Sequence, residues 1–323
     1  MKRLLAVLAA AIPLLLAAGT QAAEWPAKPV KVVVAYAAGG ANDLLARVFA
    51  ERLSEAFGQQ FIVENRTGGG GLIGAEAVAR SEPDGYTLMA SGLPSHVLAP
   101  AMNPRNAGFD PVRNFTHIAY LGGPPNVFVV HSSSAVKSFR ELLDLMRSQP
   151  GGVEYVSPSI GSVGNMVAEY VAAREKIKLV HVVYRGGSAA ILDLVAGHVK
   201  VGSMTLATTL PHIRAGALRP VAISSAGRVP ELPGVPTLVE LGYPELVVTT
   251  WYALSGPAGL PRDIVDRLNR EVNKAMDVPK VREHLAQEAV QIRPMTPEEM
   301  TRFMKSEVDK WVPAVKAMNI VLQ

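Results

Sequence analysis

The residues with the clearest chemical potential lie in a turn near the amino end of the chain. In KPVKVVVAYAAGGANDLLARVFAERL, residues 28–53, a valine-rich run enters Gly39 and Gly40 and leaves at once with apolar residues at helical spacing. Glycine lets the backbone turn sharply without a Cβ penalty. The first-turn N–H groups of the following helix have no intrahelical partner and lie at the positive end of its dipole. The turn therefore predicts a binding site for a carboxylate or phosphate that needs no Arg or Lys.

Three further Gly/Ser-rich turns precede helical segments. They are TGGGGLIG at 67–74, PSIGSVGN at 158–165 and YRGGSAAILDLVAGHV at 184–199. We expect one helix to begin near Asn165 and another to be capped by Ser188. A single turn of this kind is more often a plain helix cap than a ligand contact, but its recurrence in both halves of the chain favours a shared anion-binding role.

The turn at 67–74 also matches the dinucleotide pattern G-x-G-x-x-G at Gly69, Gly71 and Gly74. A dinucleotide site would need an acidic residue at the end of the next strand to hold the ribose. The next strand candidate, YTLMAS, ends without one. We interpret the turn as a second anion-binding turn, and the alternative that its glycines serve only a tight turn stays equally open.

Catalytic arrangements are weaker candidates. With no Cys there is no thiolate site for zinc, and no H-E-x-x-H or similar spacing joins the seven histidines, His96, His117, His131, His181, His198, His212 and His284. Ser162 lies in a glycine-rich turn but lacks the G-x-S-x-G elbow. Asp43 could act as a base or ligand contact, or simply stabilise the start of its helix. We expect a protein that is not an enzyme and uses no metal and no cofactor.

Strand-like and helical runs alternate along the chain, which predicts an α/β protein with mostly parallel sheets wrapped by helices. Ser138 with Glu141, and Thr296 with Glu299, have the spacing of capping boxes. Strand-like runs occupy 30–36, 60–64, 86–90, 115–120, 126–131, 153–157, 179–184, 199–204, 218–224 and 246–254. In such folds ligands bind at the carboxyl ends of the strands.

The C-terminal third is almost wholly helical and lacks the strands to form a domain of its own. We expect it to pack on the first part of the chain. The predicted organisation is a first lobe of residues 24–121 plus 250–323 and a second lobe of residues 122–249. Crossing segments near 120–128 and 245–253 would form a hinge, with a cleft between the lobes.

The first 22 residues have the pattern of a cleavable secretory signal peptide. Lys2 and Arg3 precede an apolar run at 4–18, and the expected cut follows Ala22. A membrane anchor fits less well, because the run is shorter than the roughly 20 residues of a spanning helix and Pro13 interrupts it. The absence of Cys excludes disulfides and a lipid-anchored lipoprotein. We therefore expect a soluble periplasmic protein.

Composition agrees with a globular α/β protein that has large buried sheets. Removal of the signal leaves 301 residues, and the chain is 49% hydrophobic and 19% charged. Its net charge of +4 falls to +2 without Lys2 and Arg3, because 30 basic residues then face 28 acidic ones. No block of Lys and Arg remains to suggest a nucleic-acid partner.

In their order along the chain, these segments resemble the Bug-type (TctC-like) extracytoplasmic solute receptors, the substrate-binding components of tripartite tricarboxylate transporters. The resemblance covers nearly the whole sequence after the signal and rests on WPAKPVKVVVAYAAGGANDLLAR (25–47), ENRTGGGGLIGAEAVARSEPDGYTL (64–88), FDPVRNF (109–115), VVYRGGSAAILDLVAGHV (182–199), IRAGALRPVAISSAGRVPELPGVPTLVELGYPE (213–245) and WYALSGPAGLP (251–261). It implies a two-lobed type II periplasmic binding protein fold, with two doubly wound sheets joined by crossing strands.

The resemblance also implies ligand contacts at matching positions of both lobes. In the first lobe these are Tyr36, Ala37, Ala38, Gly39, Gly40, Asp43, Gly70, Gly71, Ser91, Gly92 and Ser95. In the second lobe they are Ser159, Gly161, Ser162, Gly164, Asn165, Tyr184, Gly186, Gly187, Met204 and Thr205. The chain departs from the family's usual pattern at Ala35, Ala38, Thr67 and Val183, which affects loop stiffness and ligand choice.

The implied partners are a small carboxylate ligand and the membrane permease subunits of a tripartite tricarboxylate transporter, and the implied state is a monomer. Two alternatives stay open. The lobes could present the ligand to a membrane sensor kinase, or the protein could be an exported hydrolase that uses Ser162 or Ser91.

Overall fold

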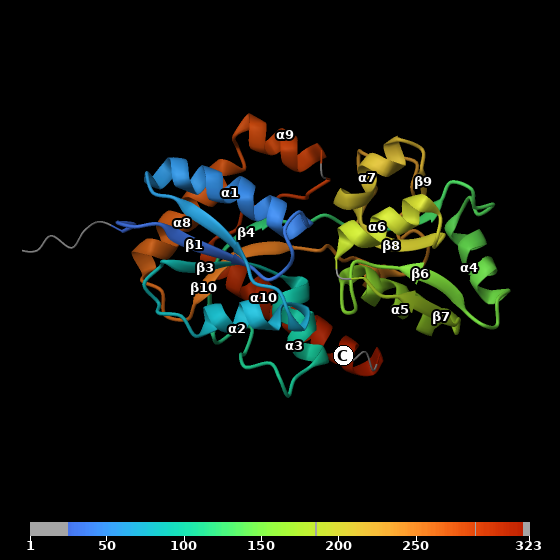
Figure 1. The fold of residues 1–323 in the computed structure, drawn as a ribbon, viewed down its shortest axis with the longest axis horizontal. Helices are drawn as coiled ribbons and strands as arrows, with labels where there is room; N and C mark the ends of the chain where they lie inside the picture. The colour runs from blue at the N-terminus through green and yellow to red at the C-terminus, as the bar shows by residue number, and fades with distance from the viewer. Residues whose placement is uncertain (1–24, 185, 288, 319–323) are drawn as a thin grey trace, which may run out of the picture.

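The computed structural model describes residues 25–184, 186–287 and 289–318, so the expected signal peptide lies outside the described residues. The chain forms two lobes, each built on a five-stranded sheet with helices around it (Figure 1). This confirms the two-lobed α/β fold expected from the sequence. The sheets are mixed, however, and not mostly parallel as the alternation of elements predicts, because β10 (Tyr252–Pro257) and β5 (Asn126–His131) run antiparallel to their neighbours. Among the described residues, no helix combines the length and the apolar character needed to cross a membrane.

The first sheet has the strand order β2-β1-β3-β10-β4. Its strands are β1 (Val30–Val34), β2 (Phe61–Asn65), β3 (Thr87–Gly92), β4 (Phe115–Gly122) and β10 (Tyr252–Pro257). Strand β1 runs parallel to β2 and β3, so the carboxyl ends of all three meet at one edge, while β10 is antiparallel to β3 and β4. Around it lie α1 (Ala41–Phe57), η1 (Gly69–Gly71), α2 (Leu72–Ala79), η2 (Leu93–Leu98), α3 (Ala99–Met102), α8 (Arg262–Ala275), α9 (Pro279–Gln287) and α10 (Pro297–Met318).

The second sheet has the order β7-β6-β8-β5-β9. Its strands are β5 (Asn126–His131), β6 (Val153–Val156), β7 (Leu179–Val182), β8 (Val201–Thr205) and β9 (Leu218–Ile223). Strand β6 is parallel to β7 and β8, which again brings three carboxyl ends to one edge. The helices of this part are α4 (Phe139–Arg147), α5 (Val163–Glu175), α6 (Gly187–Ala196), α7 (Leu206–Arg214) and η3 (Pro244–Leu246).

Two segments cross between the sheets and bond to each other. The carbonyl oxygen of Pro124 accepts the N–H of Thr250 at 2.9 Å, and Pro125 pairs with Thr249 in an antiparallel bridge. On the side of the second sheet, Ser224 Oγ accepts the N–H of Asn126 at 2.8 Å and donates to the carbonyl oxygen of Val248. The two crossings are therefore bonded to each other, and the hinge expected there stays a prediction.

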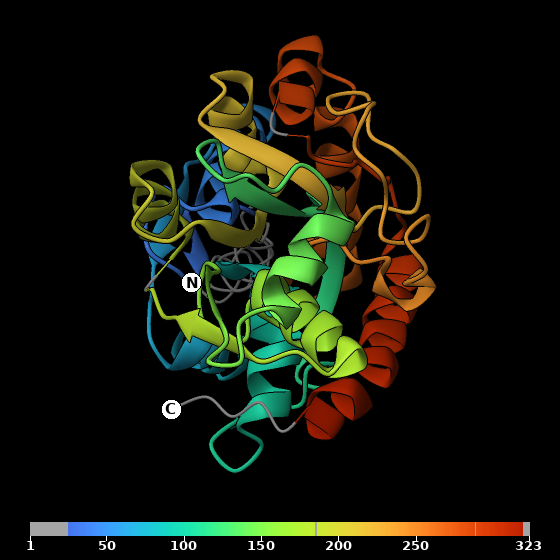
Figure 2. The same ribbon diagram turned by 90° about the vertical axis from the view of Figure 1, so that its right-hand side faces the viewer.

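Helix α10 extends the contact between the lobes. It packs on β4 and α3 of the first lobe and also on α5 of the second. Figure 2, in which the second lobe faces the viewer, shows α10 (red) along one side of the molecule. Buried Met304 and Trp311 of this helix belong to the same apolar cluster as Phe128 and Tyr155 of the second sheet. The lobe limits deduced from the sequence stay a prediction, because this helix contacts both lobes.

Three local expectations differ from the structure. The run at 246–254 is not one strand, because η3 and an irregular crossing precede β10, which begins at Tyr252. Helix α5 begins at Val163, ahead of Asn165, because Ser162 takes the cap position. Helix α6 begins at Gly187, with Gly186 in the cap position, so Ser188 is a helical residue and not the cap.

Candidate functional site

Helices begin directly after the carboxyl ends of the parallel strands in both lobes. In the first lobe α1 follows β1 and α2 follows β2, and in the second α5, α6 and α7 follow β6, β7 and β8. Within the described residues, α5 alone among these five helices has a side-chain cap, from Ser162. The first turns of the other four helices have no capping side chain, and first-turn N–H groups without a partner attract anions. Some of these groups are already bonded, because Leu72 and Ile73 of α2 donate to the carbonyl oxygens of Gly69 and Gly68, and Leu206 of α7 donates to that of Pro125.

The first turn of α1 is held in place by Asp43. Its carboxylate accepts the N–H of Gly39 at 2.9 Å, two hydrogen bonds from Arg47 at 3.0 Å and one from Asn65 Nδ2 at 2.9 Å. Burial alone would raise the pKa of Asp43, but these hydrogen bonds outweigh it and hold the pKa below its usual range. The carboxylate is only 2% exposed and ties the loop to its helix, while Ala37, Ala38 and Gly39 form the exposed crest of that loop.

Three loops of the first lobe meet at Gly71. The hydroxyl of Tyr36 donates to the carbonyl oxygen of Gly70 at 3.0 Å. A Cβ placed on Gly71 would lie 2.7 Å from Ser95 Cβ and 3.1 Å from the Tyr36 hydroxyl. Gly71 also has a φ of 104°, which side chains rarely adopt. The turns after β1, β2 and β3 thus converge, as the sequence predicts for a shared site.

Two residues expected in this site lie in the sheet instead. Ser91 is fully buried in β3, and its Oγ bonds to the carbonyl oxygen of Ala253 at 3.1 Å and to Ser255 Oγ at 3.0 Å. Gly92 is packed against Tyr252, whose Cδ1 would lie 2.8 Å from an added Cβ. Both residues support the strand that ends at the site, and their role as ligand contacts stays a prediction.

In the second lobe, Ser162 and Asn165 organise the turn before α5. Ser162 Oγ accepts the N–H of Asn165 at 3.2 Å and donates to the carbonyl oxygen of Ser159 at 2.8 Å. The side chain of Asn165 accepts the N–H of Gly161 at 2.9 Å and donates to the Tyr155 hydroxyl at 2.7 Å. These bonds fix the loop from within, as the Asp43 network does in the first lobe.

Gly164 lies at the contact between α5 and β8, whereas Met204 of β8 packs with residues of α6 and α7. A Cβ on Gly164 would be 2.0 Å from the carbonyl oxygen of Ser203, so only glycine lets the helix approach this strand. Met204 is fully buried in the apolar core of the second lobe. Both residues act through packing of the elements that carry the site, and their role as ligand contacts stays a prediction.

The turns before α6 and α7 lie beside the turn before α5. The N–H of Gly186 donates to the carbonyl oxygen of Pro158 at 2.9 Å, and an added Cβ on Gly187 would lie 3.7 Å from Thr208 Cγ2. Thr205 takes the cap position of α7 without a side-chain capping bond. Tyr184 donates its hydroxyl to Asp193 at 2.6 Å, and its pKa is raised to about 12, chiefly by burial and then by that bond.

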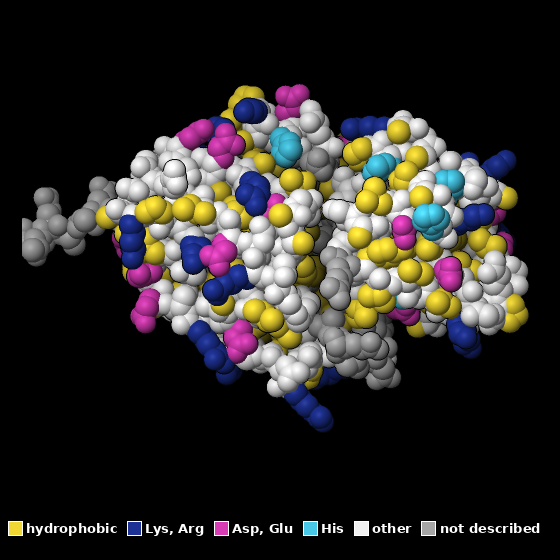
Figure 3. All heavy atoms as spheres, viewed as in Figure 1, with side chains coloured by type: hydrophobic (Ala, Val, Ile, Leu, Met, Phe, Trp, Pro, Cys, Tyr) yellow, Lys and Arg dark blue, Asp and Glu magenta, His cyan; other side chains and the backbone are white. Residues whose placement is uncertain are grey.

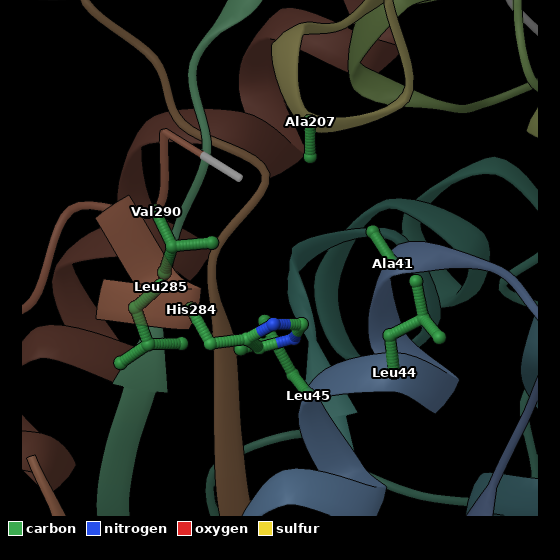
Figure 4. Close-up of a pocket in the computed structure, with 7 residues that line it drawn as sticks. All are labelled: Ala41, Leu44, Leu45, Ala207, His284, Leu285 and Val290. Atoms are coloured by element: carbon green, nitrogen blue, oxygen red, sulfur yellow. The ribbon is translucent and has the colours of Figure 1, made fainter. Parts of the chain in front are cut away.

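A pocket spans the two lobes at these helix starts. It is lined by Ala41, Leu44 and Leu45 of α1, Ala207 of α7, His284 and Leu285 of α9, and Val290 (Figure 4). Ala41 is the first residue of α1 and Ala207 is in the first turn of α7, so two helix starts without a capping side chain face one space from opposite lobes. In Figure 3 mostly uncharged surface borders the groove between the lobes.

His284 was not expected in the site. It lies on α9, far from every glycine-rich turn, and a single histidine on an amphipathic helix has no sequence pattern that marks it as a pocket residue. Only the packing of α9 beside α1 brings it to the space between the lobes.

The chemistry available to Ser162 is limited. Its Oγ lies 3.2 Å from Ser157 Oγ, which in turn lies 2.8 Å from His181 Nε2, so the imidazole reaches Ser162 only through a second hydroxyl. Burial lowers the pKa of His181. In the part of the chain that the structure describes, no group of three or more His, Asp or Glu side chains could hold a metal ion.

Comparison with known proteins places this geometry in a family. The receptors of the tripartite tricarboxylate transporter family match residues 45–320. Protein BugT of Bordetella pertussis is 32% identical over 100% of this chain and 99% of its own length. A protein encoded in the tcbD-tcbE intergenic region of Pseudomonas sp. strain P51 is 36% identical over 89% of this chain and 85% of its own length.

Solved structures agree. Rpa4515 of R. palustris, solved with adipate, has a TM-score of 0.86 at 31% identity and covers 92% of this chain and 99% of its own. The periplasmic binding protein BugD has a TM-score of 0.84 at 27% identity, over 93% of this chain and all of its own. MatC from Rhodopseudomonas palustris, with bound malate, has a TM-score of 0.83 at 29% identity, over 90% of this chain and 99% of its own. The fold is that of these binding proteins, and the chain belongs to the TctC family of tripartite tricarboxylate transporter receptors.

Proposed function

We propose that the protein is a periplasmic receptor that captures a small organic carboxylate between its lobes and delivers it to a tripartite tricarboxylate transporter. One observation carries the proposal: the first turns of α1 and α7, from opposite lobes and without side-chain caps, line one pocket. N–H groups at helix starts bind carboxylates without cationic side chains. Two similar solved proteins, Rpa4515 and MatC, hold adipate and malate.

The mechanism is closure of the first lobe (24–121 plus 250–323) on the second (122–249) about the crossing segments. A ligand bound by both lobes makes its full set of contacts only in the closed form, so it shifts the population toward that form. The bonds of Pro124 with Thr250 and of Ser224 with Val248 keep the crossings together during this motion. The ligand leaves chemically unchanged.

A thermal-shift screen of mono-, di- and tricarboxylates tests the binding step. A true ligand at 100 times its dissociation constant stabilises the folded state by about 2.7 kcal/mol. The uncharged amide of the same acid is the control and should give no shift. Equal shifts with the acid and the amide, or no shift with any acid, would contradict the proposal.

A substitution at Ala41 tests the location of the site. Ala41→Asp places a carboxylate in the first turn of α1, where it favours the helix but repels an anionic ligand. We expect at least a tenfold weaker carboxylate affinity than in Ala41→Asn, which is nearly the same size and uncharged. Equal affinities of the two variants would place the ligand elsewhere.

Delivery to a permease needs an experiment in cells. Deletion of the gene should lower uptake of the carboxylate found in the screen, and a plasmid copy should restore it. Unchanged uptake with lost induction of carboxylate genes would indicate the sensory role instead. Turnover of esters that disappears in Ser162→Ala would indicate the hydrolase.

A further inference from the structure

His181 of β7 is joined to the start of α5 by two serine hydroxyls. Its Nε2 lies 2.8 Å from Ser157 Oγ, which lies 3.2 Å from the Oγ of Ser162. Ser162 caps α5 by accepting the N–H of Asn165 at 3.2 Å. Both serines are buried, with Ser157 0% and Ser162 5% exposed. A change at the imidazole is therefore transmitted through buried side chains to the turn before α5, one of the turns expected to contact the ligand.

The hydroxyl of Ser157 can pair with either protonation state of the imidazole. When the ring is neutral, Nε2 accepts a hydrogen bond from Ser157. When the ring is protonated, Nε2 donates, and the Ser157 hydroxyl turns to the carbonyl oxygen of Ser159, 3.1 Å away. The ring is only half-buried, and Nδ1 has no hydrogen-bond partner in the part of the chain that the structure describes, so this nitrogen can exchange a proton with water. Protonation thus leaves every member of the hydroxyl chain with a partner.

The elements packed against His181 contribute few groups that could fix its charge. Tyr155 of β6 stacks on the ring at 4.9 Å between centroids and donates its hydroxyl to Glu169 of α5 at 2.7 Å. The other charged or titratable residues of β6, α5 and the segments flanking β7, among the described residues, are Glu154, Tyr170, Arg174, Glu175, Lys176, Lys178 and Tyr184. Burial lowers the pKa of His181, so the ring is neutral in the free receptor near pH 7.

We infer that His181 is a positioning residue that couples carboxylate binding to proton uptake, so that the receptor binds its ligand more tightly as the pH falls from 7.5 to 5.5. This inference rests on the proposed function. A carboxylate at the start of α5 places a negative charge at the end of the hydroxyl chain, and that charge favours the protonated imidazole. Coupling is reciprocal, so protonation of His181 favours the bound state by the same factor. His181 acts through Ser157 and Ser162 and not by touching the ligand.

The test measures the affinity for acetate, succinate, adipate and citrate by calorimetry at pH 7.5 and 5.5, on the full mature chain. The informative quantity is the ratio of the affinity at pH 5.5 to that at pH 7.5, compared between wild type and His181→Gln. Glutamine can still bond to Ser157 but does not titrate, and protonation of the acid itself affects both proteins alike. We expect the ratio to be at least threefold higher in wild type.

His131→Gln is the matched control. His131 is also a half-buried histidine of the second sheet that bonds to a serine, with Nδ1 2.7 Å from Ser133 Oγ. It ends β5, which runs antiparallel to β8, so it lies at the opposite edge of the sheet from the helix starts. Its ratio should equal that of wild type. Equal ratios in wild type and His181→Gln, or the same loss in His131→Gln, overturn the inference.

A second measurement uses wild type alone. Calorimetry at pH 6.5 in two buffers of different ionisation enthalpy counts the protons exchanged on binding. Protons that the acid releases when it binds as an anion are known from its own titration, and uptake beyond them comes from the protein. Thermal melting of each ligand-free variant at both pH values establishes folding, and His181→Asn replaces His181→Gln if glutamine prevents it. Binding without proton uptake overturns the inference while leaving the proposed function intact, whereas a wild type that binds none of the four acids overturns both.

Discussion

At the scale of single residues, Gly164 decides how closely α5 approaches β8. An alanine Cβ there would lie 2.0 Å from the carbonyl oxygen of Ser203, and neither backbone can move without breaking the sheet or the helix start. We expect Gly164→Ala to lower the free energy of unfolding by about 3 kcal/mol, the upper end of overpacking costs. Urea denaturation measures this. Gly151→Ala, where no atom lies within 4 Å, is the control and should change little.

At Lys176 we expect a substitution to stabilise the protein, in contrast to Gly164→Ala. Lys176 ends α5 in the left-handed region, with a φ of 55°, and its side chain is exposed. Glycine adopts this conformation without a Cβ penalty, so Lys176→Gly should raise the free energy of unfolding by about 1 kcal/mol. Ala173→Gly, three residues earlier in the helix, should lower it by about the same amount. Stability changes of the same sign in both variants would contradict this account of the helix end.

At the scale of elements, the turn η2 joins the site to the core of the first lobe. It carries Ser95, which contacts the Gly71 loop, and next to it the fully buried His96. The ring of His96 packs on Phe115 at 4.2 Å between centroids and lies 6.2 Å from the ring of His117. Neither ring nitrogen of His96 has a partner, and Nε2 of His117 has none. Two neutral imidazoles thus lie beneath the site.

This pair predicts acid sensitivity. Burial lowers the pKa of His96 well below 6.5 and that of His117 to about 4. Below pH 6.5 the two histidines therefore bind protons in the unfolded state more readily than in the folded state. Stability should be constant above about pH 6.5 and fall as the pH drops from there toward 4, by about 1.4 kcal/mol per unit for each histidine. His96→Leu should reduce the loss between pH 6.5 and 5 by about 2 kcal/mol. Denaturant unfolding at several pH values measures it, and a loss in His96→Leu equal to that of wild type would contradict this account.

Helix and strand limits could be predicted from the sequence where hydrogen bonds between residues close in the chain determine them. Thr296 and Glu299 form the reciprocal capping box that their spacing indicates, with bonds of 2.9 and 3.2 Å. The strand predicted at 246–254 was partly wrong because the β-branched run 247–250 has strand-like residues but crosses between lobes, where no neighbouring strand continues beside it. Local pattern cannot distinguish a crossing segment from a sheet strand.

The same limit applies to the site. Glycine-rich turns are recognisable in the sequence, so the turns around Gly71 and Gly186 could be predicted without the structure. Whether Ser91 faces the cleft or strand β10 depends on a residue 164 positions away, Ser255, whose hydroxyl it bonds. His284 reaches the pocket only because α9 packs beside α1. Contacts between distant segments decide these roles, and no single stretch of sequence contains them.

At the scale of the whole molecule, the two lobes are linked by more than a flexible tether. The crossings at 123–125 and 247–251 bond to each other. A third segment joins them, because Gln291 and Gly123 exchange two backbone hydrogen bonds. We expect two bonded crossings to allow rotation of one lobe on the other and to oppose separation or twisting of the lobes. A ligand that bridges the lobes should therefore produce one defined closing motion.

Closure can be measured by energy transfer between two dyes, because the chain has no Cys and introduced cysteines are labelled uniquely. Ile62→Cys on β2 and Leu192→Cys on α6 place the dyes on exposed positions of different lobes. We expect transfer efficiency to rise when the carboxylate found by thermal shift is added, and to saturate at the same concentration. A second pair, Val180→Cys with Leu192→Cys, lies within one lobe and should show no change. Binding without any change in the first pair would mean that the lobes are already closed around an empty site, and that ligand capture does not depend on hinge motion.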